Sequence, residues 1–240
     1  MNSTEQVPQK SQSWQMFNTI SSRYDFLNHF LSFGLDRSWR RKVAKSLTSQ
    51  PHQRVLDLAT GTADTLLAFL KYNPHVVSAV GIDLADKMLD IGRGKVRQEK
   101  FEDKIILQHG DASQIPFGDQ SFHATSIVFG IRNVVDPMIV LKEMYRVLKV
   151  GGRALILEFS LPANCFVRAV HLFYLRTVVP FIGWLFSGNY HAYRYLNLTI
   201  EEFPYGEKFC ALMRQAGFQS IKTHPLFFGA ATIYQGDKMP

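Results

Sequence analysis

RVLDLATGTAD, residues 54–64, is the stretch that decides the fold of this chain. Its first half is a short apolar run, which predicts a buried strand, and its small residues predict a tight turn before a helix that begins near Asp64. A turn built of small residues lets the backbone approach a ligand closely, as in nucleotide-binding α/β proteins. We therefore interpret this stretch as one side of a nucleotide-binding cradle.

The loop taken by itself is an incomplete glycine motif. Its alternate small positions are Ala59, Gly61 and Ala63, so only one of the three is glycine. An ordinary strand–turn–helix unit with no ligand would explain this pattern equally well. The loop alone leaves both interpretations open.

Acidic residues after the next two apolar runs favour the cradle. Asp83 follows the second run, where a carboxylate can accept hydrogen bonds from two ribose hydroxyls, although it could instead cap a helix at residues 85–89. Asp111 and Ala112 follow the third run in the same way. A ligand that crosses the carboxyl ends of adjacent parallel strands would meet the loop and these residues in order.

The chain alternates short apolar runs with helical periodicity from residue 54 to residue 159. This alternation predicts an α/β fold whose parallel sheet carries helices on both faces. Asp136-Pro137 predicts the start of one helix, and Gly151-Gly152 predicts its end. The predicted strands are residues 55–58, 76–82, 104–109, 125–129, 154–159, 220–223 and 230–235. The predicted helices are residues 64–72, 86–98, 137–148 and 205–216.

We predict a single domain over residues 13–240, preceded by a disordered tail at residues 1–12. Residues 13–50 form a helical cap that is broken at Gly34. Residues 161–199 interrupt the alternation, are rich in aromatic side chains and contain no Asp or Glu. We interpret this segment as a helical insert after the fifth strand that acts as a lid over the substrate. A plain helical layer or a dimer interface would also explain it.

The composition indicates in which cellular compartment the protein works and what kind of partner it binds. The chain has 240 residues and a net charge of +7, which suits an anionic partner such as nucleic acid or a membrane surface. Its two cysteines, Cys165 and Cys210, form no disulfide framework and predict a reducing compartment. No apolar signal segment opens the chain, and the longest apolar stretch, residues 177–186, is too short to span a bilayer. We therefore expect a soluble or peripheral protein.

The ordered motifs resemble those of the class I S-adenosylmethionine (SAM) methyltransferases. They comprise the loop with Gly61 and Thr62, the acid Asp83, the pair Asp111-Ala112 and the turn LKVGGR at residues 148–153. The resemblance implies a Rossmann-like fold with a mostly parallel seven-stranded sheet, and SAM as the cofactor. It further implies that Gly61 and Thr62 lie beside the methionine part of SAM, that Asp83 holds the ribose, and that Asp111 and Ala112 lie along the adenine.

Two longer signatures resemble those of the quinone-biosynthesis C-methyltransferases. The first is YDFLNHFLSFG at residues 24–34, and the second is FGIRNV at residues 129–134, followed by YRVLK at residues 145–149. The resemblance runs from about Trp14 to the end of the chain. It implies methylation of a ring carbon in a polyprenylated quinol, either demethylmenaquinol or a ubiquinol precursor. The chain departs from the family pattern at Ala63 (usually Gly), Val150 (usually Pro) and Val128 (Ser in some members).

This reaction requires a ring carbon in line with the methyl group and a means to stabilise the phenolate that activates the ring. Arg132 and Asn133 follow the fourth strand, and we predict that they are the catalytic residues. Arg132 would stabilise the phenolate or hold a water that carries the proton, because arginine itself stays protonated. Alternatively, Arg132 pairs with Asp136 or Glu158, and Asn133 caps the next helix.

We further predict that Tyr24, Asn28 and His29 bind the substrate, although Tyr24 also fits the apolar stripe of its helix. The proton acceptor stays open among His29, His171 and His191. No metal is expected. The expected partners are the polyprenylated quinol and the membrane surface, with a homodimer as a further expectation, and the expected location is cytoplasmic, at the inner face of the cytoplasmic membrane.

Other functions remain open at this stage. A SAM methyltransferase for another lipophilic small molecule, such as a sterol or polyketide, would carry the same cofactor motifs. A non-catalytic SAM-binding partner of a biosynthetic complex is a second alternative, favoured by the substitution at Ala63. Nucleic acid is not an expected partner, because the fourth strand is not followed by an Asn-Pro-Pro-Tyr base-flipping motif.

Overall fold

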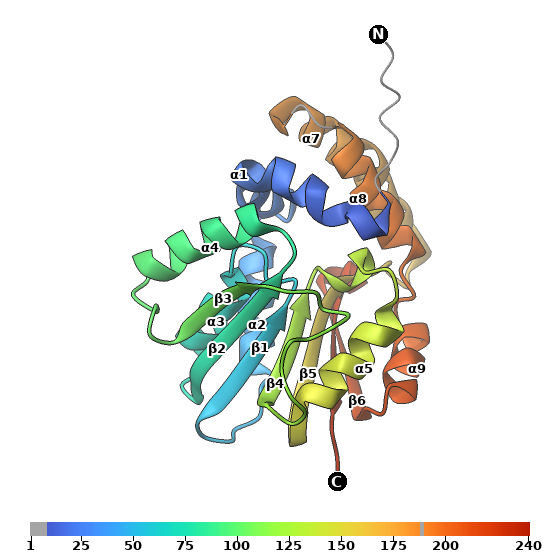
Figure 1. Ribbon diagram of the computed structural model, residues 1–240. Coiled ribbons are helices and arrows are strands. Elements are labelled where there is room, and N and C mark those ends of the chain that lie inside the picture. Colours follow the sequence, from blue (N-terminus) through green and yellow to red (C-terminus); the bar gives the residue numbers. More distant parts are fainter. Residues whose placement is uncertain (1–8, 188–189) are drawn as a thin grey trace.

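The computed structural model describes residues 9–187 and 190–240, and their centre is a twisted sheet (Figure 1). In this part of the chain the sheet has seven strands in the order β3-β2-β1-β4-β5-β7-β6. All neighbouring strands are parallel except β7, which runs antiparallel to both β5 and β6. The predicted mostly parallel seven-stranded sheet is confirmed. The strands are β1 Gln53–Leu58, β2 Val76–Asp83, β3 Ile105–His109, β4 Phe122–Val128, β5 Leu148–Phe159, β6 Gln219–Leu226 and β7 Ala231–Asp237.

Helices cover both faces of the sheet, as the alternation predicted. The helices α2 (Leu35–Lys45), α3 (Asp64–Tyr72) and α4 (Asp86–Gln98) cover one face, and α5 (Pro137–Val147) and α9 (Glu207–Gln215) cover the other. Alternate side chains of β1 enter opposite cores: Leu56 packs under α5, whereas Val55 packs under α3. Burial on both faces explains why these strands are apolar throughout rather than alternating.

The N-terminal cap lies over the carboxyl edge of the parallel strands with its first helix and packs on one face of the sheet with its second. It consists of α1 (Ser13–Leu31) and α2, and the chain turns between them at Gly34, whose φ is 74°. The predicted helix break at Gly34 is confirmed. Lys10–Gln12 form a 3-10 turn, so the predicted disordered tail does not include these residues. The rest of that tail, residues 1–8, lies outside the described part of the chain.

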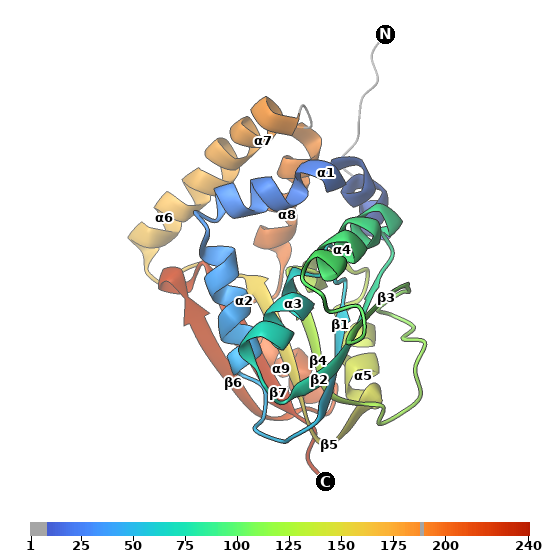
Figure 2. The same cartoon turned by 90° about the vertical axis from the view of Figure 1, so that its left-hand side faces the viewer.

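The insert after β5 is helical, as predicted, and rises beside the cap (Figure 2). The helix α6 (Cys165–Phe173) continues through a π turn, Tyr174–Val178, into α7 (Val179–Ser187), and α8 (Tyr190–Glu202) returns to the domain. Residues 188–189 of the predicted insert lie outside the described residues.

One helix of the insert is longer than the unbroken apolar stretch at residues 177–186. Cys165–Gly183 is long and apolar enough, by length and composition, to cross a membrane, with a mean hydropathy of 1.4. Arg168 and Arg176 interrupt its apolar residues, so the helix does not stand out in the sequence as one unbroken apolar run. Only 17% of this segment is buried, so it is not a core helix.

The glycine pair Gly151-Gly152 has a different role from the predicted helix stop. The helix α5 ends at Val147, and both glycines lie inside β5, which begins at Leu148. A Cβ on Gly152 would lie only 2.8 Å from the carbonyl oxygen of Lys149 and 2.9 Å from that of His123. Close backbone approach in the sheet therefore requires glycine here. The predicted helix start is confirmed, because the Asp136 side chain accepts a hydrogen bond from the Met138 N–H at 2.8 Å.

Candidate active site

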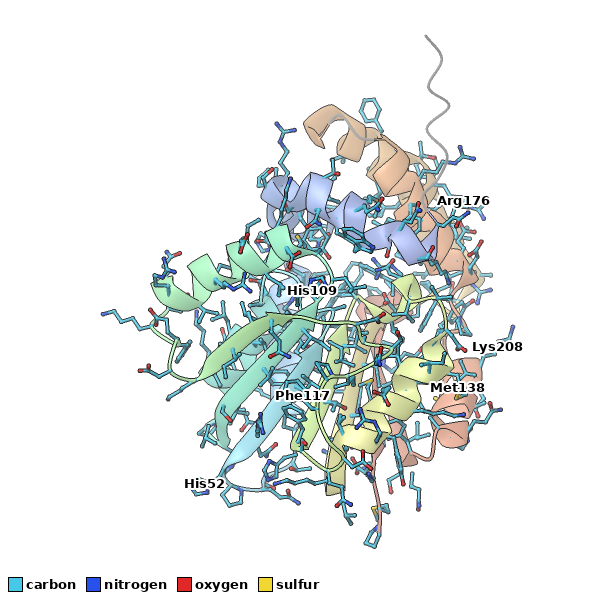
Figure 3. All side chains as sticks on the ribbon, viewed as in Figure 1. His52, His109, Phe117, Met138, Arg176 and Lys208 are labelled. Atoms are coloured by element: carbon cyan, nitrogen blue, oxygen red, sulfur yellow. The ribbon has the colours of Figure 1, made fainter. Side chains whose placement is uncertain are left out.

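Two cavities adjoin at the carboxyl edge of the parallel strands, beneath the N-terminal cap. His109 at the end of β3 marks this edge in Figure 3, whereas His52 marks the opposite edge, before β1. The first cavity has a volume of about 330 Å³ and lies at the ends of β1, β2, β3 and β4. This is the place where ligands bind in open α/β sheets. Its polar and small lining residues include Gly61, Asp83, Asp111, Ala112 and Asn133.

The loop after β1 has an unusual backbone. Ala59, Gly61 and Ala63 all adopt positive φ values, of 47°, 55° and 67°. This conformation suits glycine, and at each alanine it costs on the order of 1 kcal/mol. The departure from the family pattern at Ala63 therefore keeps the left-handed turn and adds strain to it.

Asp83 holds this strained loop in place. Its Oδ2 accepts a hydrogen bond from the Gly61 N–H at 2.8 Å, and its Oδ1 accepts one from the Ala85 N–H at 2.8 Å. A carboxylate can accept about four hydrogen bonds, so acceptor capacity remains for a ligand in the first cavity. Burial raises the pKa of Asp83, and the backbone N–H donors oppose this shift. The carboxylate thus bonds to the Ala85 N–H just before α4 and also lines the first cavity, and its contact with a ribose stays a prediction.

Replacement of Asp83 by alanine is expected to weaken SAM binding by about 1–3 kcal/mol, since it removes charge-assisted hydrogen bonds. Calorimetric titration of SAM into the folded variant measures this loss. Asp83→Asn is the matched variant: it keeps an acceptor for the loop and should lose less affinity. Unchanged SAM affinity in Asp83→Ala would contradict the assignment.

Thr62 is the predicted cofactor residue that the structure does not bring into the cavity. Its hydroxyl donates to Asp25 Oδ1 at 2.6 Å and accepts from Lys95 Nζ at 2.9 Å. Lys95 also forms ion pairs with Asp25 at 2.7 Å and with Asp64 at 2.5 Å. The Thr62 side chain therefore ties the loop to α1 and α4 instead of facing a ligand. Thr62 is therefore not among the residues that line the first cavity, and its place beside the methionine part of SAM stays a prediction.

The second cavity is apolar, has a volume of about 290 Å³, and lies between the cap, the insert and the sheet. Tyr24 and Phe129 line both cavities and therefore mark where they meet. Asn28 lines the second cavity, as expected of a substrate residue. Burial raises the pKa of Tyr24, while the nearby positive charge of Arg132 opposes that shift.

His29 was also predicted to bind the substrate, and the structure places it elsewhere. Its Nδ1 lies 2.8 Å from Asp36 Oδ1, and Asp36 in turn pairs with Arg40 at 2.6 Å. All three residues line a polar hollow beside α2 and α3, and Asp36 and Arg40, but not His29, also line the second cavity. His29 thus belongs to a charge cluster that connects α1 and α2. His171 lines the second cavity, and its buried Nε2 has no hydrogen-bond partner among the described residues. The side chain of His191 lies outside the described residues.

Arg132 lines the second cavity as half of a buried ion pair. Its Nη1 lies 2.6 Å from Glu158 Oε1 and donates to the Phe129 carbonyl at 2.8 Å. The two side chains are 4% and 0% exposed. The pairing with Glu158 that the sequence left open is therefore present. Burial raises the pKa of Glu158, and the charge of Arg132 opposes the shift.

The guanidinium of Arg132 retains capacity for a ligand. Its Nε is buried without a hydrogen-bond partner among the described residues, and its Cζ lies 5.3 Å from the centre of the Phe159 ring. Asn133 lies on the other side of the junction, in the first cavity, and its Nδ2 donates to the Phe129 carbonyl at 3.4 Å. Asp136, and not Asn133, caps the next helix.

Several walls of the first cavity come from residues that were not predicted as cofactor-binding. The missed residues Lys10, Ser11, Trp14 and Phe17 close the cavity from above. Lys10 and Ser11 lie in the segment predicted as a tail. Trp14 and Phe17 carried a signal, their helical spacing, but that spacing predicts burial and not what is buried against them. Cavity walls that come from distant segments require the tertiary structure.

Solved structures share this fold. A SAM-dependent methyltransferase from Thermotoga maritima superposes with a TM-score of 0.64 at 21% identity, covering 94% of this chain and 99% of that chain. A second, from Aquifex aeolicus, gives a TM-score of 0.57 at 15% identity, covering 82% and 88%. The fold and the site together define a class I SAM-dependent methyltransferase.

The chain belongs to the ubiE/COQ5 methyltransferase family, whose model matches residues 5–238. A ubiquinone/menaquinone biosynthesis C-methyltransferase from Geotalea daltonii is 47% identical over 93% of this chain and 95% of its own length. Demethylmenaquinone methyltransferases from Thermus thermophilus and Thermotoga maritima are 43% and 41% identical, over 93% and 95% of this chain and 100% and 96% of their own lengths.

The residues of the first cavity fit SAM. Asp83 offers free acceptor positions for a ribose, Met88 and Ala112 offer apolar surface for an adenine, and Gly61 turns in the left-handed conformation without a Cβ in the way. The cofactor, when bound, supplies a methyl group on a positively charged sulfur. The acidic edge formed by Asp83 and Asp111 complements that charge.

Proposed function

We propose that the protein methylates a ring carbon of a polyprenylated quinol, which agrees with relatives named as a ubiquinone/menaquinone biosynthesis C-methyltransferase and as demethylmenaquinone methyltransferases. The substrate would be demethylmenaquinol, a ubiquinol precursor, or both. The observation that carries the proposal is the apolar second cavity, which meets the cofactor cavity at Tyr24 and Phe129 and contains the buried Arg132. An aromatic ring held at this junction has its polar groups near Arg132 and its apolar tail in the second cavity.

Arg132 would act on the charge that develops on the ring. A hydroquinone carbon becomes a strong nucleophile when its neighbouring hydroxyl loses a proton, so the enzyme gains from stabilising the phenolate. A guanidinium fixed by Glu158 in an apolar cavity interacts with an anion far more strongly than it would in water. Tyr24 and Asn28 lie close enough to one another to hydrogen-bond and would position the ring from the α1 side. Asn133 would orient the ring from the cofactor side.

Turnover of demethylmenaquinol is the direct test. The purified protein, with tritium-labelled SAM and reduced demethylmenaquinone, is expected to transfer label to the quinol. Asp83→Ala serves as the control at low SAM concentration, where its weaker SAM binding should lower the transfer. Labelling of a sterol or polyketide extract but not of either quinol would favour the first alternative. SAM binding without transfer to any of these would favour a non-catalytic assembly partner and overturn the proposal.

We further propose that the reaction takes place at the inner face of the cytoplasmic membrane, with the protein bound peripherally. A polyprenylated quinol resides in the bilayer, and the net charge of +7 favours an anionic lipid surface. Free Cys165 and Cys210 are consistent with a reducing compartment. A homodimer stays a prediction.

A further inference from the structure

We infer that four side chains around the mouth of the second cavity enter the bilayer and admit the prenyl chain of the substrate directly from the lipid. This apolar rim consists of Phe33, Val170, Phe227 and Phe228. The inference rests on the proposed function, which identifies the substrate as a polyprenylated quinol. It adds which part of the protein surface contacts the bilayer and how the prenyl tail reaches the second cavity.

Two properties occur together in these four residues. Each lines the second cavity, and each is more than half exposed: Phe33 74%, Val170 55%, Phe227 54% and Phe228 78%. Side chains that line a ligand cavity are normally covered, and exposed phenylalanines are normally scattered. Here the exposed apolar surface continues from the outside of the molecule into the cavity.

The rim is assembled from three separate parts of the chain. Phe33 comes from the turn between α1 and α2, Val170 from α6, and the phenylalanine pair from a 3-10 turn, Phe227–Gly229, before β7. The Phe33 ring lies 5.9 Å from that of Tyr174 on the insert, and the rings of Phe227 and Phe228 lie 5.6 Å apart. The first contact joins the α1–α2 turn to the insert, the second lies within the 3-10 turn, and all three parts line the same cavity.

The backbone of the rim is strained where the rings are presented. Phe33, Phe227 and Phe228 have φ values of 52°, 43° and 56°. A bulky residue adopts this left-handed conformation only when the surrounding structure enforces it, and such strain occurs preferentially at functional sites. Glycine or asparagine would satisfy these turns more readily. The three positions therefore combine an unfavourable backbone with an unfavourable exposure in water.

The helix beside the rim extends the apolar surface. Phe166, Val170 and Phe173 follow one another at helical spacing and are 76%, 55% and 63% exposed. They belong to Cys165–Gly183, which has the hydropathy of a membrane-crossing helix but is only 17% buried. In Figure 2 this helix forms the upper outer edge of the molecule, next to the ends of the C-terminal strands. Such a helix can lie along the membrane interface with its apolar face inserted.

Lipid is the occupant that the observations favour. The cavity behind the rim is itself apolar, so the prenyl chain can pass from the bilayer into it without contact with water. Residues 161–199 contain no Asp or Glu but carry Arg168 and Arg194, which complements anionic headgroups. A second copy of the chain would cover the same surface, but it would also close the mouth of the cavity.

The test compares the full chain with the triple variant Phe33→Ser/Phe227→Ser/Phe228→Ser. All three side chains are exposed, so the fold and SAM binding should persist. Flotation with phosphatidylglycerol vesicles is expected to show vesicle binding reduced at least about tenfold, since each inserted ring contributes through its buried area. Turnover of a long-chain quinol embedded in those vesicles should fall in parallel. Turnover of a water-soluble quinol with one isoprene unit should fall far less than that of the long-chain quinol, because a short tail makes fewer contacts with the rim and needs no transfer from the bilayer.

Ile106→Ser/Val150→Ser is the matched control, because these apolar side chains are also exposed but lie away from the rim. It should bind vesicles as the unmodified protein does. Equal vesicle binding by the triple variant would overturn the inference, as would an equal loss of turnover on the short quinol. A dimer in sedimentation that the triple variant loses, with vesicle binding unchanged, would assign the rim to a second copy. If the unmodified protein methylates neither quinol, the proposed function fails. The difference in vesicle binding between the unmodified protein and the triple variant still shows whether the rim enters the bilayer.

Discussion

Replacement of Arg132 by alanine is expected to lower turnover by about a hundredfold or more, the effect of removing a group that stabilises a developing oxyanion. SAM affinity should stay nearly unchanged, because Arg132 lines the second cavity and not the first. The same substitution leaves Glu158 buried without its partner. We therefore expect a parallel loss of about 3–5 kcal/mol in the free energy of unfolding.

A second variant separates catalysis from stability. Arg132→Gln/Glu158→Gln removes both charges and keeps groups that can hydrogen-bond to each other and to the Phe129 carbonyl. Replacing both members of a buried pair by neutral groups is far less destabilising than removing one. The double variant should therefore recover most of the stability lost in Arg132→Ala while its turnover stays low. Glu158→Gln alone keeps the Arg132 guanidinium, so its turnover should fall less than that of Arg132→Ala or of the double variant.

Urea unfolding and steady-state kinetics with a short-chain quinol measure the two effects separately. Low turnover in a fully folded double variant would support the role of Arg132 in the reaction. Turnover restored together with stability would show that the ion pair has only a structural function, which is the alternative that the sequence left open.

Most of the fold could be predicted because the parallel sheet is buried on both faces. Burial makes its strands short apolar runs, and the helices between them carry the 3.6-residue period. The ends of helices and strands were less predictable where they depend on how closely two backbone segments approach each other. Gly151 and Gly152 carry the signal of a helix end, but the crowding around Gly152 comes from the carbonyl of His123 on a neighbouring strand. That neighbour is not visible in the local sequence.

Site residues that directly follow a strand could be predicted from the sequence. Site residues whose side chains hydrogen-bond to a different helix or loop were harder to predict. Asp83, Asp111 and Ala112 reach the first cavity because the sheet places all strand ends at one edge. Thr62 and His29 instead bond to Asp25 and Asp36. Each of these bonds depends on how α1 packs. The catalytic and binding roles themselves stay predictions.

The buried carboxyl of Asp57 should make the stability of the protein depend on pH near neutrality. Asp57 is 1% exposed, and the Ser126 hydroxyl donates to its Oδ1 at 2.5 Å. Burial raises the pKa of Asp57 to about 7, whereas an unfolded aspartate has a pKa of 3.8. Between these values the folded protein holds a proton that the unfolded chain has lost. The contribution of Asp57 to the free energy of unfolding is therefore fully present below pH 3.8. It decreases as the pH rises above that value and is lost as the pH passes through about 7.

Asp57→Asn removes this dependence, since the amide is neutral at every pH. One pKa unit corresponds to about 1.4 kcal/mol, so the variant should gain about 2–3 kcal/mol relative to the unmodified protein between pH 5 and pH 8. The comparison across pH cancels any constant change in hydrogen bonding at the site. Urea unfolding of both proteins at several pH values between 5 and 8 measures this gain in the free energy of unfolding.

Ser126→Ala provides the matched control for Asp57→Asn. Loss of the hydroxyl that stabilises the carboxylate raises the folded pKa further, so the fall in stability should extend to higher pH. Parallel stability curves for Asp57→Asn and the unmodified protein over pH 5–8 would contradict the prediction. They would mean that Asp57 stays ionised in the core beneath the cofactor loop, and that the strained turn from Ala59 to Ala63 rests on a buried negative charge.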